Sequence, residues 1–124
     1  MELQPILPEG RQIIERYGAA GFRVSGIFYK GSILVFADRT QSWPVEAAAG
    51  VSLESLAPVF AHGGVEMLVV GLGRKGGILG QALRLGLKEA GIAFEPMETG
   101  AACRTYNILL GEDRPVAAAL LPFA

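Results

Sequence analysis

A strand, a helix and a second strand follow one another in the middle of this 124-residue chain, and this order most constrains its fold. Residues 65–70 form an apolar run with one acid, which is typical of a strand covered on both faces. Residues 78–90 carry apolar side chains at mainly helical spacing and end at Gly91. Residues 92–96 form the next apolar run. Two strands joined through a helix pair in parallel by a right-handed crossover, so this part predicts an α/β protein.

The N-terminal third predicts antiparallel strands. Phe22–Tyr29 and Ser32–Phe36 are rich in β-branched and aromatic residues. Lys30-Gly31 lies between them and predicts a hairpin turn. A short extended segment is expected around Trp43, because the following proline disfavours helical backbone there. Trp43 itself is expected in the core, with a partner anchor as the alternative.

The C-terminal third predicts a helix and a last strand. Thr99 is a suitable N-cap for a helix that runs to about Leu110. Residues 115–121 predict a final strand whose small side chains suit a crowded central position. The expected fold class is therefore α/β: a single three-layer domain, residues 1–124, with a mixed central β-sheet flanked by helices and an N-terminal β-hairpin region.

The charge and cysteine content exclude several classes of function. Eleven basic and twelve acidic residues give a net charge of −1, which provides no general attraction to nucleic acid or anionic lipid. One cysteine and one histidine allow neither an internal disulfide nor a Cys/His zinc cluster, so we expect no metal. No apolar run approaches the ~20 residues of a transmembrane helix. With no targeting signal visible at the N-terminus, we expect a cytoplasmic protein.

The segment Gly71-Leu-Gly73-Arg-Lys-Gly76 matches the dinucleotide-binding pattern G-x-G-x-x-G and follows a predicted strand. Glu95 lies near the spacing of the carboxylate that binds ribose in such folds. The alternative, which we favour, is a tight turn between strand and helix, because the chain has no second mononucleotide-binding half. We therefore expect no cofactor, although Arg74 and Lys75 allow a small anion to bind at this turn.

The segment Thr99–Asn107 gathers polar groups at a predicted helix start. The helix dipole and Arg104 favour a thiolate at Cys103, but no histidine lies nearby, which favours a structural cysteine. Arg104 and Asn107 share one helix face and suit either a carboxylate or peptide ligand or the carbonyl groups of a helix end.

These patterns predict a small polar cleft between the glycine turn and the helix start, without a catalytic set. Its expected residues are Gly71, Gly73, Arg74, Thr99, Cys103, Arg104, Tyr106 and Asn107.

The order of several short segments along about residues 13–122 resembles one small α/β family. The segments are Tyr17, Gly21-Phe22, Ser25-Gly26, Gly31-Ser32, Trp43, Val69–Gly73, Gly91-Ile92, Met97–Thr99, Ala102–Asn107 and Ala117–Pro122. The family comprises uncharacterised bacterial and archaeal proteins together with the mitochondrial complex I assembly factor 3 and an adipogenesis-associated cytosolic protein. It often has Gly-Thr-Gly where this chain has Gly71-Leu72-Gly73, so a hydroxyl at that turn is lost here.

The resemblance implies a three-layer fold, no established activity or cofactor, and an accessory role through protein contacts. We therefore expect a non-enzymatic accessory or assembly-type protein whose polar cleft binds a protein partner. The alternative function is a small nucleotide-binding or thiol-dependent enzyme that uses the Gly71–Gly76 turn and Cys103.

Overall fold

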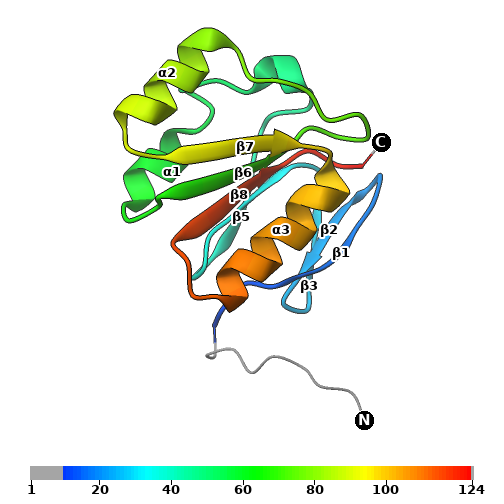
Figure 1. Ribbon diagram of the computed structural model, residues 1–124. Coiled ribbons are helices and arrows are strands. Elements are labelled where there is room, and N and C mark those ends of the chain that lie inside the picture. The colour runs from blue at the N-terminus through cyan, green and yellow to red at the C-terminus, as the bar shows by residue number, and fades with distance from the viewer. Residues whose placement is uncertain (1–9, 124) are drawn as a thin grey trace.

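The computed structural model describes residues 10–123, and Figure 1 shows the arrangement of their helices and strands. The elements are, in chain order, β1 (Ile14–Tyr17), β2 (Gly21–Val24), β3 (Ile27–Lys30), β4 (Ile33–Val35), β5 (Thr40–Ser42), the 3-10 helix η1 (Ala48–Gly50), α1 (Ala57–His62), β6 (Met67–Gly71), α2 (Gln81–Glu89), β7 (Ala93–Met97), α3 (Thr99–Gly111) and β8 (Val116–Leu120).

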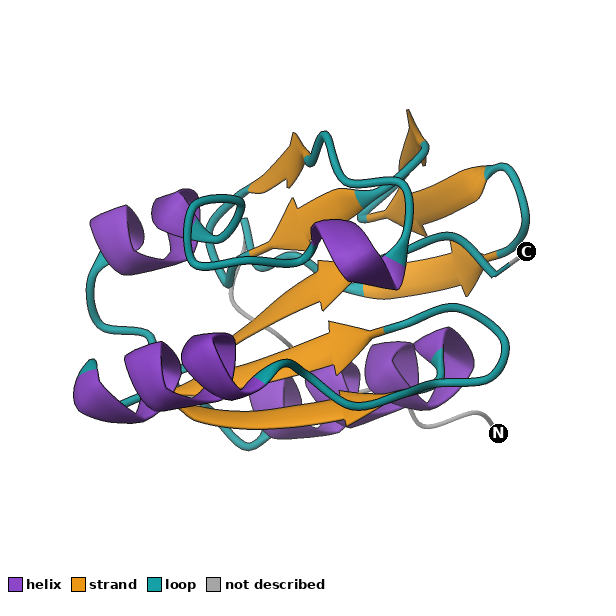
Figure 2. Cartoon of the chain, turned by 90° about the horizontal axis from the view of Figure 1, so that it is seen from above, coloured by secondary structure: helices purple, strands orange, loops and turns teal. Residues whose placement is uncertain are grey.

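The strands form two sheets. A five-stranded mixed sheet has the order β5-β4-β8-β6-β7, in which β6 runs parallel to β7 and β8 while β4 runs antiparallel to β8 and β5. A three-stranded antiparallel sheet has the order β1-β2-β3. Helices α1 and α2 cover one face of the larger sheet, and α3 with the smaller sheet covers the other (Figures 1 and 2). The predicted α/β fold with three layers and a mixed central sheet is confirmed.

Strand β8 occupies the centre of the larger sheet, as its small side chains predict. All five of its residues are buried. The side chain of Ala117 packs in the core under α1 and α2, whereas that of Ala118 packs in the core under α3. A strand covered on both faces is apolar throughout, as β8 is.

The predicted hairpin at Lys30-Gly31 is wrong. The hairpin turn lies at Ser25 and Gly26, both at positive φ, and joins β2 to β3. At Gly31 the chain instead passes from the smaller sheet to the larger one. The sequence did not reveal this turn because the apolar residues Ile27 and Phe28 continue the pattern beyond it, although both side chains are more than half exposed.

The predicted start of the central helix is also wrong. Helix α2 begins at Gln81, and Ile78, the first residue of the predicted helix, is 86% exposed. Its end is as predicted, because Gly91 follows the last turn with a φ of +76°. Nine residues, 72–80, therefore separate the end of β6 from the helix.

Candidate functional site

The carboxyl ends of β6, β7 and β8 lie together at one edge of the larger sheet. We call this region, residues 71–76, 97–104 and 121–123 with the neighbouring end of β1, the C-terminal edge. In open α/β sheets, ligands usually bind outside the carboxyl ends of the strands.

Thr99 joins the glycine turn to the helix start at this edge. Its backbone N–H donates to the carbonyl of Gly73 at 2.8 Å, and its hydroxyl accepts from the N–H of Gly73 at 2.8 Å. The same hydroxyl donates to the carbonyl of Leu121 at 2.7 Å. Gly71 is needed for this close approach, since a Cβ there would lie 3.1 Å from Cα of Thr99. The structure thus brings the two predicted segments together, with the buried Thr99 side chain between them.

The N-cap of α3 is Glu98, which corrects the prediction that Thr99 has this role. The Glu98 carboxylate accepts from the N–H of Ala101 at 2.6 Å. Thr99 is instead the first helical residue, because its hydroxyl is held by Gly73 and Leu121. A carboxylate at this position also interacts favourably with the positive end of the helix dipole.

Cys103 faces the core and is 2% exposed. Burial raises the pKa of its thiol to about 12, and the Glu98 carboxylate adds to this rise, while Arg104 opposes it more weakly. The thiol therefore stays protonated at neutral pH, as the structural interpretation of this cysteine predicts.

Tyr106 and Asn107 hold the N-terminal part of the chain against α3. The buried hydroxyl of Tyr106 donates to the carbonyls of Gln12 at 2.9 Å and Phe36 at 3.2 Å. Asn107 accepts from the N–H of Ile14 at 3.0 Å and donates to its carbonyl at 2.7 Å. Both side chains have their polar atoms engaged with backbone, which is a structural task.

Arg74 and Arg104 are the exposed cations of the predicted set. The guanidinium of Arg104 donates to the hydroxyl of Tyr17 at 3.0 Å and lies 3.6 Å from the Glu98 carboxylate. The ring of Tyr17 meets that of Phe123 edge to face at a centroid distance of 5.8 Å. The guanidinium of Arg74 lies over the other aromatic ring, 4.7 Å from the Phe123 centroid. We call Arg74, Phe123, Tyr17 and Arg104 the arginine–aromatic row.

Gly100 makes room for this row. A Cβ at this position would lie 2.6 Å from the hydroxyl of Tyr17 and 2.9 Å from the Glu98 carboxylate. Sequence reasoning did not place Tyr17 or Phe123 in the site, and it included Gly100 only as part of the Thr99–Asn107 segment, without a role. They come from three separate segments, and no local pattern connects them.

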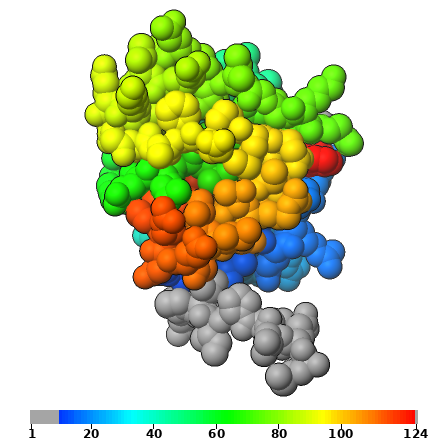
Figure 3. Space-filling model, viewed as in Figure 1, coloured from blue at the N-terminus to red at the C-terminus, as the bar shows by residue number. Residues whose placement is uncertain are grey.

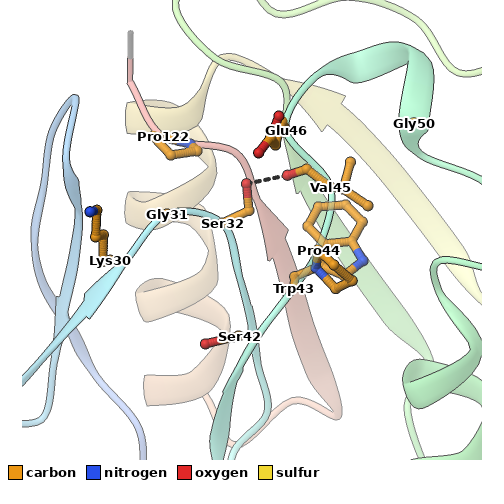
Figure 4. A pocket seen from close by; sticks show the side chains of 10 residues that line it. All are labelled: Lys30, Gly31, Ser32, Ser42, Trp43, Pro44, Val45, Glu46, Gly50 and Pro122. Carbon is orange, nitrogen blue, oxygen red and sulfur yellow. Dashed lines mark hydrogen bonds between the residues drawn. The ribbon is translucent and has the colours of Figure 1, made fainter.

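Two open cavities lie near the glycine turn, and both are lined in part by Glu46 and Pro122. The first has a volume of about 570 Å³, and Figure 4 shows its lining: Lys30, Gly31, Ser32, Ser42, Trp43, Pro44, Val45, Glu46, Gly50 and Pro122. The second has a volume of about 350 Å³ and is lined by Glu46, Ala47, Ala48, Leu72, Gly73, Arg74, Lys75, Leu121 and Pro122. Trp43 is 3% exposed and donates to the Ser55 carbonyl, so its predicted core position is confirmed.

The dinucleotide pattern does not open a helix here. Helix α2 starts at Gln81, so Arg74 and Lys75 lie in a loop without a helix dipole. Gly73 and Gly76 both have positive φ, and a Cβ on Gly76 would lie 3.1 Å from the backbone nitrogen of Glu98. The glycines thus serve a turn packed against the neighbouring strand end. Arg74 and Lys75 do line the second cavity, and anion binding there stays a prediction.

Two kinds of site are not found within residues 10–123. No three His, Cys, Asp or Glu side chains of this part are grouped to hold a metal ion. No helix in this range has the length and apolar character needed to cross a membrane.

Comparison with known proteins gives one family and several relatives. The family model described as "Protein of unknown function (DUF498/DUF598)" matches residues 14–121. An uncharacterized protein of Rhodobacter capsulatus is 36% identical over 110 residues, covering 88% of this chain and 83% of that protein. The NADH dehydrogenase [ubiquinone] 1 alpha subcomplex assembly factor 3 of Danio rerio is 34% identical over 111 residues, covering 89% of this chain and 64% of the relative. The chain thus spans less than two thirds of that assembly factor.

Solved structures share the fold closely. A protein described as an outer membrane protein from Bartonella henselae has a TM-score of 0.86 at 34% identity, covering 93% of this chain and 98% of that one. A Bordetella pertussis protein described as an Mth938-like domain has a TM-score of 0.83 at 27% identity, covering 98% and 92%.

Proposed function

Because the chain belongs to the DUF498/DUF598 family of proteins of unknown function, whose relatives include complex I assembly factors, we propose that it is a non-enzymatic assembly-type accessory protein. It acts by binding a partner protein at the C-terminal edge. The observation that carries this proposal is the similarity to the assembly factors along nearly the whole of this chain.

The arginine–aromatic row supports the choice of surface. Arginine, tyrosine and other aromatic residues are enriched in the energetically dominant parts of protein interfaces. The Arg104 side chain is 63% exposed, and Tyr17 is 39% exposed. These groups are accessible to a partner while Glu98 and Phe123 restrict their movement.

The engagement of the other polar groups supports a non-enzymatic role. Cys103 has no accessible thiolate, and Thr99, Tyr106 and Asn107 are tied to backbone groups. A thiol-dependent enzyme needs a deprotonated, reachable sulfur, which this environment disfavours.

The proposal concerns the part that this chain shares with its relatives. Since the chain spans 64% of the Danio rerio assembly factor, we propose partner binding as the common property and do not transfer assembly of a respiratory complex as a whole. A cytoplasmic location for this binding belongs to the same proposal.

The test is quantitative affinity capture from a lysate of the source organism, including its detergent extract. The native chain is compared with Arg74→Ala/Arg104→Ala, in which both exposed cations of the row are removed. Arg84→Ala/Lys88→Ala, which removes two exposed cations of α2, is the matched control. Circular dichroism and thermal unfolding establish that all three are folded.

We expect at least one protein that the native chain and the α2 control enrich and that the row variant loses. Equal enrichment by the row variant would contradict the proposed surface. If the native chain enriches no protein from either extract, the accessory function itself is wrong.

A further inference from the structure

We propose that the partner presents an acidic segment to the C-terminal edge, with its carboxylates on Arg74 and Arg104 and an apolar side chain against Tyr17 and Phe123. This inference rests on the proposed function, since it specifies the chemistry of the partner at that same surface. In Figure 3 the end of the chain (red) emerges between the loop after β6 (green), the start of α3 (yellow to orange) and the first strands (blue).

Six cations lie at this part of the molecule, and two of them, Arg23 and Arg104, are paired with acids. Arg74 and Lys75 line the second cavity, and Lys30 lines the first. Arg16 and Arg23 line a third hollow of about 410 Å³ that also includes Tyr17. Within the described part of the chain, no ion pair involves Arg16, Lys30, Arg74 or Lys75. Because the whole chain has a net charge of −1, this excess is a local feature.

The two arginines of the row are held in place with hydrogen-bond donors to spare. Arg104 uses one donor for Tyr17, and the Glu98 carboxylate beside it is already bound by the N–H of Ala101. Arg74 rests on the Phe123 ring. A guanidinium has five N–H donors and binds a carboxylate through two of them. Side chains already ordered before binding lose less entropy when a partner docks.

The pattern favours an acidic protein segment over nucleic acid. Glu46 and Glu98 lie among the cations, and a continuous run of phosphates would meet both carboxylates. The aromatic pair between Arg74 and Arg104 offers an apolar contact between two charge contacts. A segment in which acidic side chains flank an apolar one matches this spacing of chemical types.

The test selects binders from a display library of short random peptides. The native chain and the Arg84→Ala/Lys88→Ala control are expected to enrich peptides in which Asp or Glu flanks an apolar residue. The variant Arg74→Glu/Arg104→Glu, in which both charges are reversed, is expected to lose this enrichment and to prefer peptides with Lys or Arg. Enrichment without acidic residues, or acidic enrichment that persists in the reversed variant, would overturn the inference.

Fluorescence anisotropy with one selected acidic peptide measures how much each substitution weakens peptide binding. We expect Arg74→Ala/Arg104→Ala to weaken its affinity about tenfold or more, equivalent to about 1.4 kcal/mol. The same peptide with Gln for each acid should bind as weakly to the native chain. Equal affinity for the Gln peptide, or tighter binding of a single-stranded RNA of matched length, would show that the partner chemistry is wrong.

A competition experiment separates this inference from the proposed function. Excess acidic peptide is expected to displace the captured partner. If the row variant loses the partner but the acidic peptide does not displace it, the accessory function stands and the acidic segment is wrong.

Discussion

The two edges of the five-stranded sheet use the same residue types differently. At the edge where β6 and β8 begin, which we call the N-terminal edge, three cations lie beside acids: Arg11 pairs with Asp113, His62 with Asp38, and Arg114 with Glu112. A fourth cation there, Arg39, lies over the Phe36 ring. At the C-terminal edge, Arg74 rests on an aromatic ring, and Arg104 shares its acid with a helix cap. Charges neutralised by neighbours stabilise the fold modestly, whereas a cation without an acid partner, such as Arg74, remains available to a partner protein.

The strongest test of this comparison uses two neighbours on α3. Asn107→Ala leaves the N–H and carbonyl of Ile14 without their partners, which should lower the free energy of unfolding by about 2–3 kcal/mol. Arg104→Ala should change it by less than about 0.5 kcal/mol, because an exposed group toward the C-terminal edge is lost. Urea denaturation measures both. A comparable loss in Arg104→Ala would break the distinction between fold and surface.

Two tyrosines give the next largest contrast. Tyr106→Phe removes the buried hydroxyl that joins Gln12 to Phe36, so we expect a loss of about 1–2 kcal/mol in unfolding free energy. Tyr17→Phe removes an exposed hydroxyl that contacts Arg104 and should cost less than about 0.5 kcal/mol. The midpoints of urea denaturation decide this. Equal costs would mean that the arginine–aromatic row also stabilises the fold.

The stability of the protein at high pH tests the burial of the Cys103 thiol in the core. Burial raises the pKa of Cys103 to about 12, above its ordinary value of 9.0. From pH 9 upward the unfolded chain therefore releases this proton first, and stability falls by up to about 1.4 kcal/mol per pH unit from this group. Cys103→Ala should show a shallower decline in unfolding free energy between pH 9 and 10. An unchanged slope would show that the thiol ionises freely in the folded protein.

The smallest effect concerns Asp38, one of the three acids named at the N-terminal edge. The hydrogen bond from His62 lowers the pKa of Asp38 below its ordinary 3.8. The stabilisation from this pair is present above pH 3.8 and is lost as pH falls through the lowered value. Because Asp38 is exposed, its size should stay below about 1 kcal/mol. Asp38→Asn should flatten the acid limb of the stability curve, and an unaltered limb would exclude this pair as its cause.

The sequence predicted the elements that depend on local patterns. The apolar run before Gly71, the stop at Gly91 and the alanine-rich last strand each carry their signal within a few residues. The prediction failed where long-range contacts decided between local alternatives. Thr99 is the better cap by residue type. Its hydroxyl is engaged with Gly73 and Leu121, however, and Glu98 caps the helix instead.

The location of the candidate site could be predicted from the sequence, but only some of its residues could. The meeting of the glycine turn with the start of α3 follows from the parallel order of β6 and β7. The arginine–aromatic row was not predictable, because Tyr17 and Phe123 are brought together by tertiary packing. Polar residue types alone also do not separate Asn107, which binds backbone, from Arg104, which faces solvent.

Strand β8 is central in the sheet but last in the chain, so the sheet can be completed only at the end of synthesis. During synthesis β4 and β6 leave the ribosome before β8, the strand that lies between them. Until residues 116–120 arrive, two separate strand pairs, β5-β4 and β6-β7, each present an open edge to the surrounding solution. Open edges of this kind recruit other chains. A fragment that ends before β8 would therefore be prone to aggregation through the unpaired edges of β4 and β6, whereas a chain that includes β8 pairs both of them.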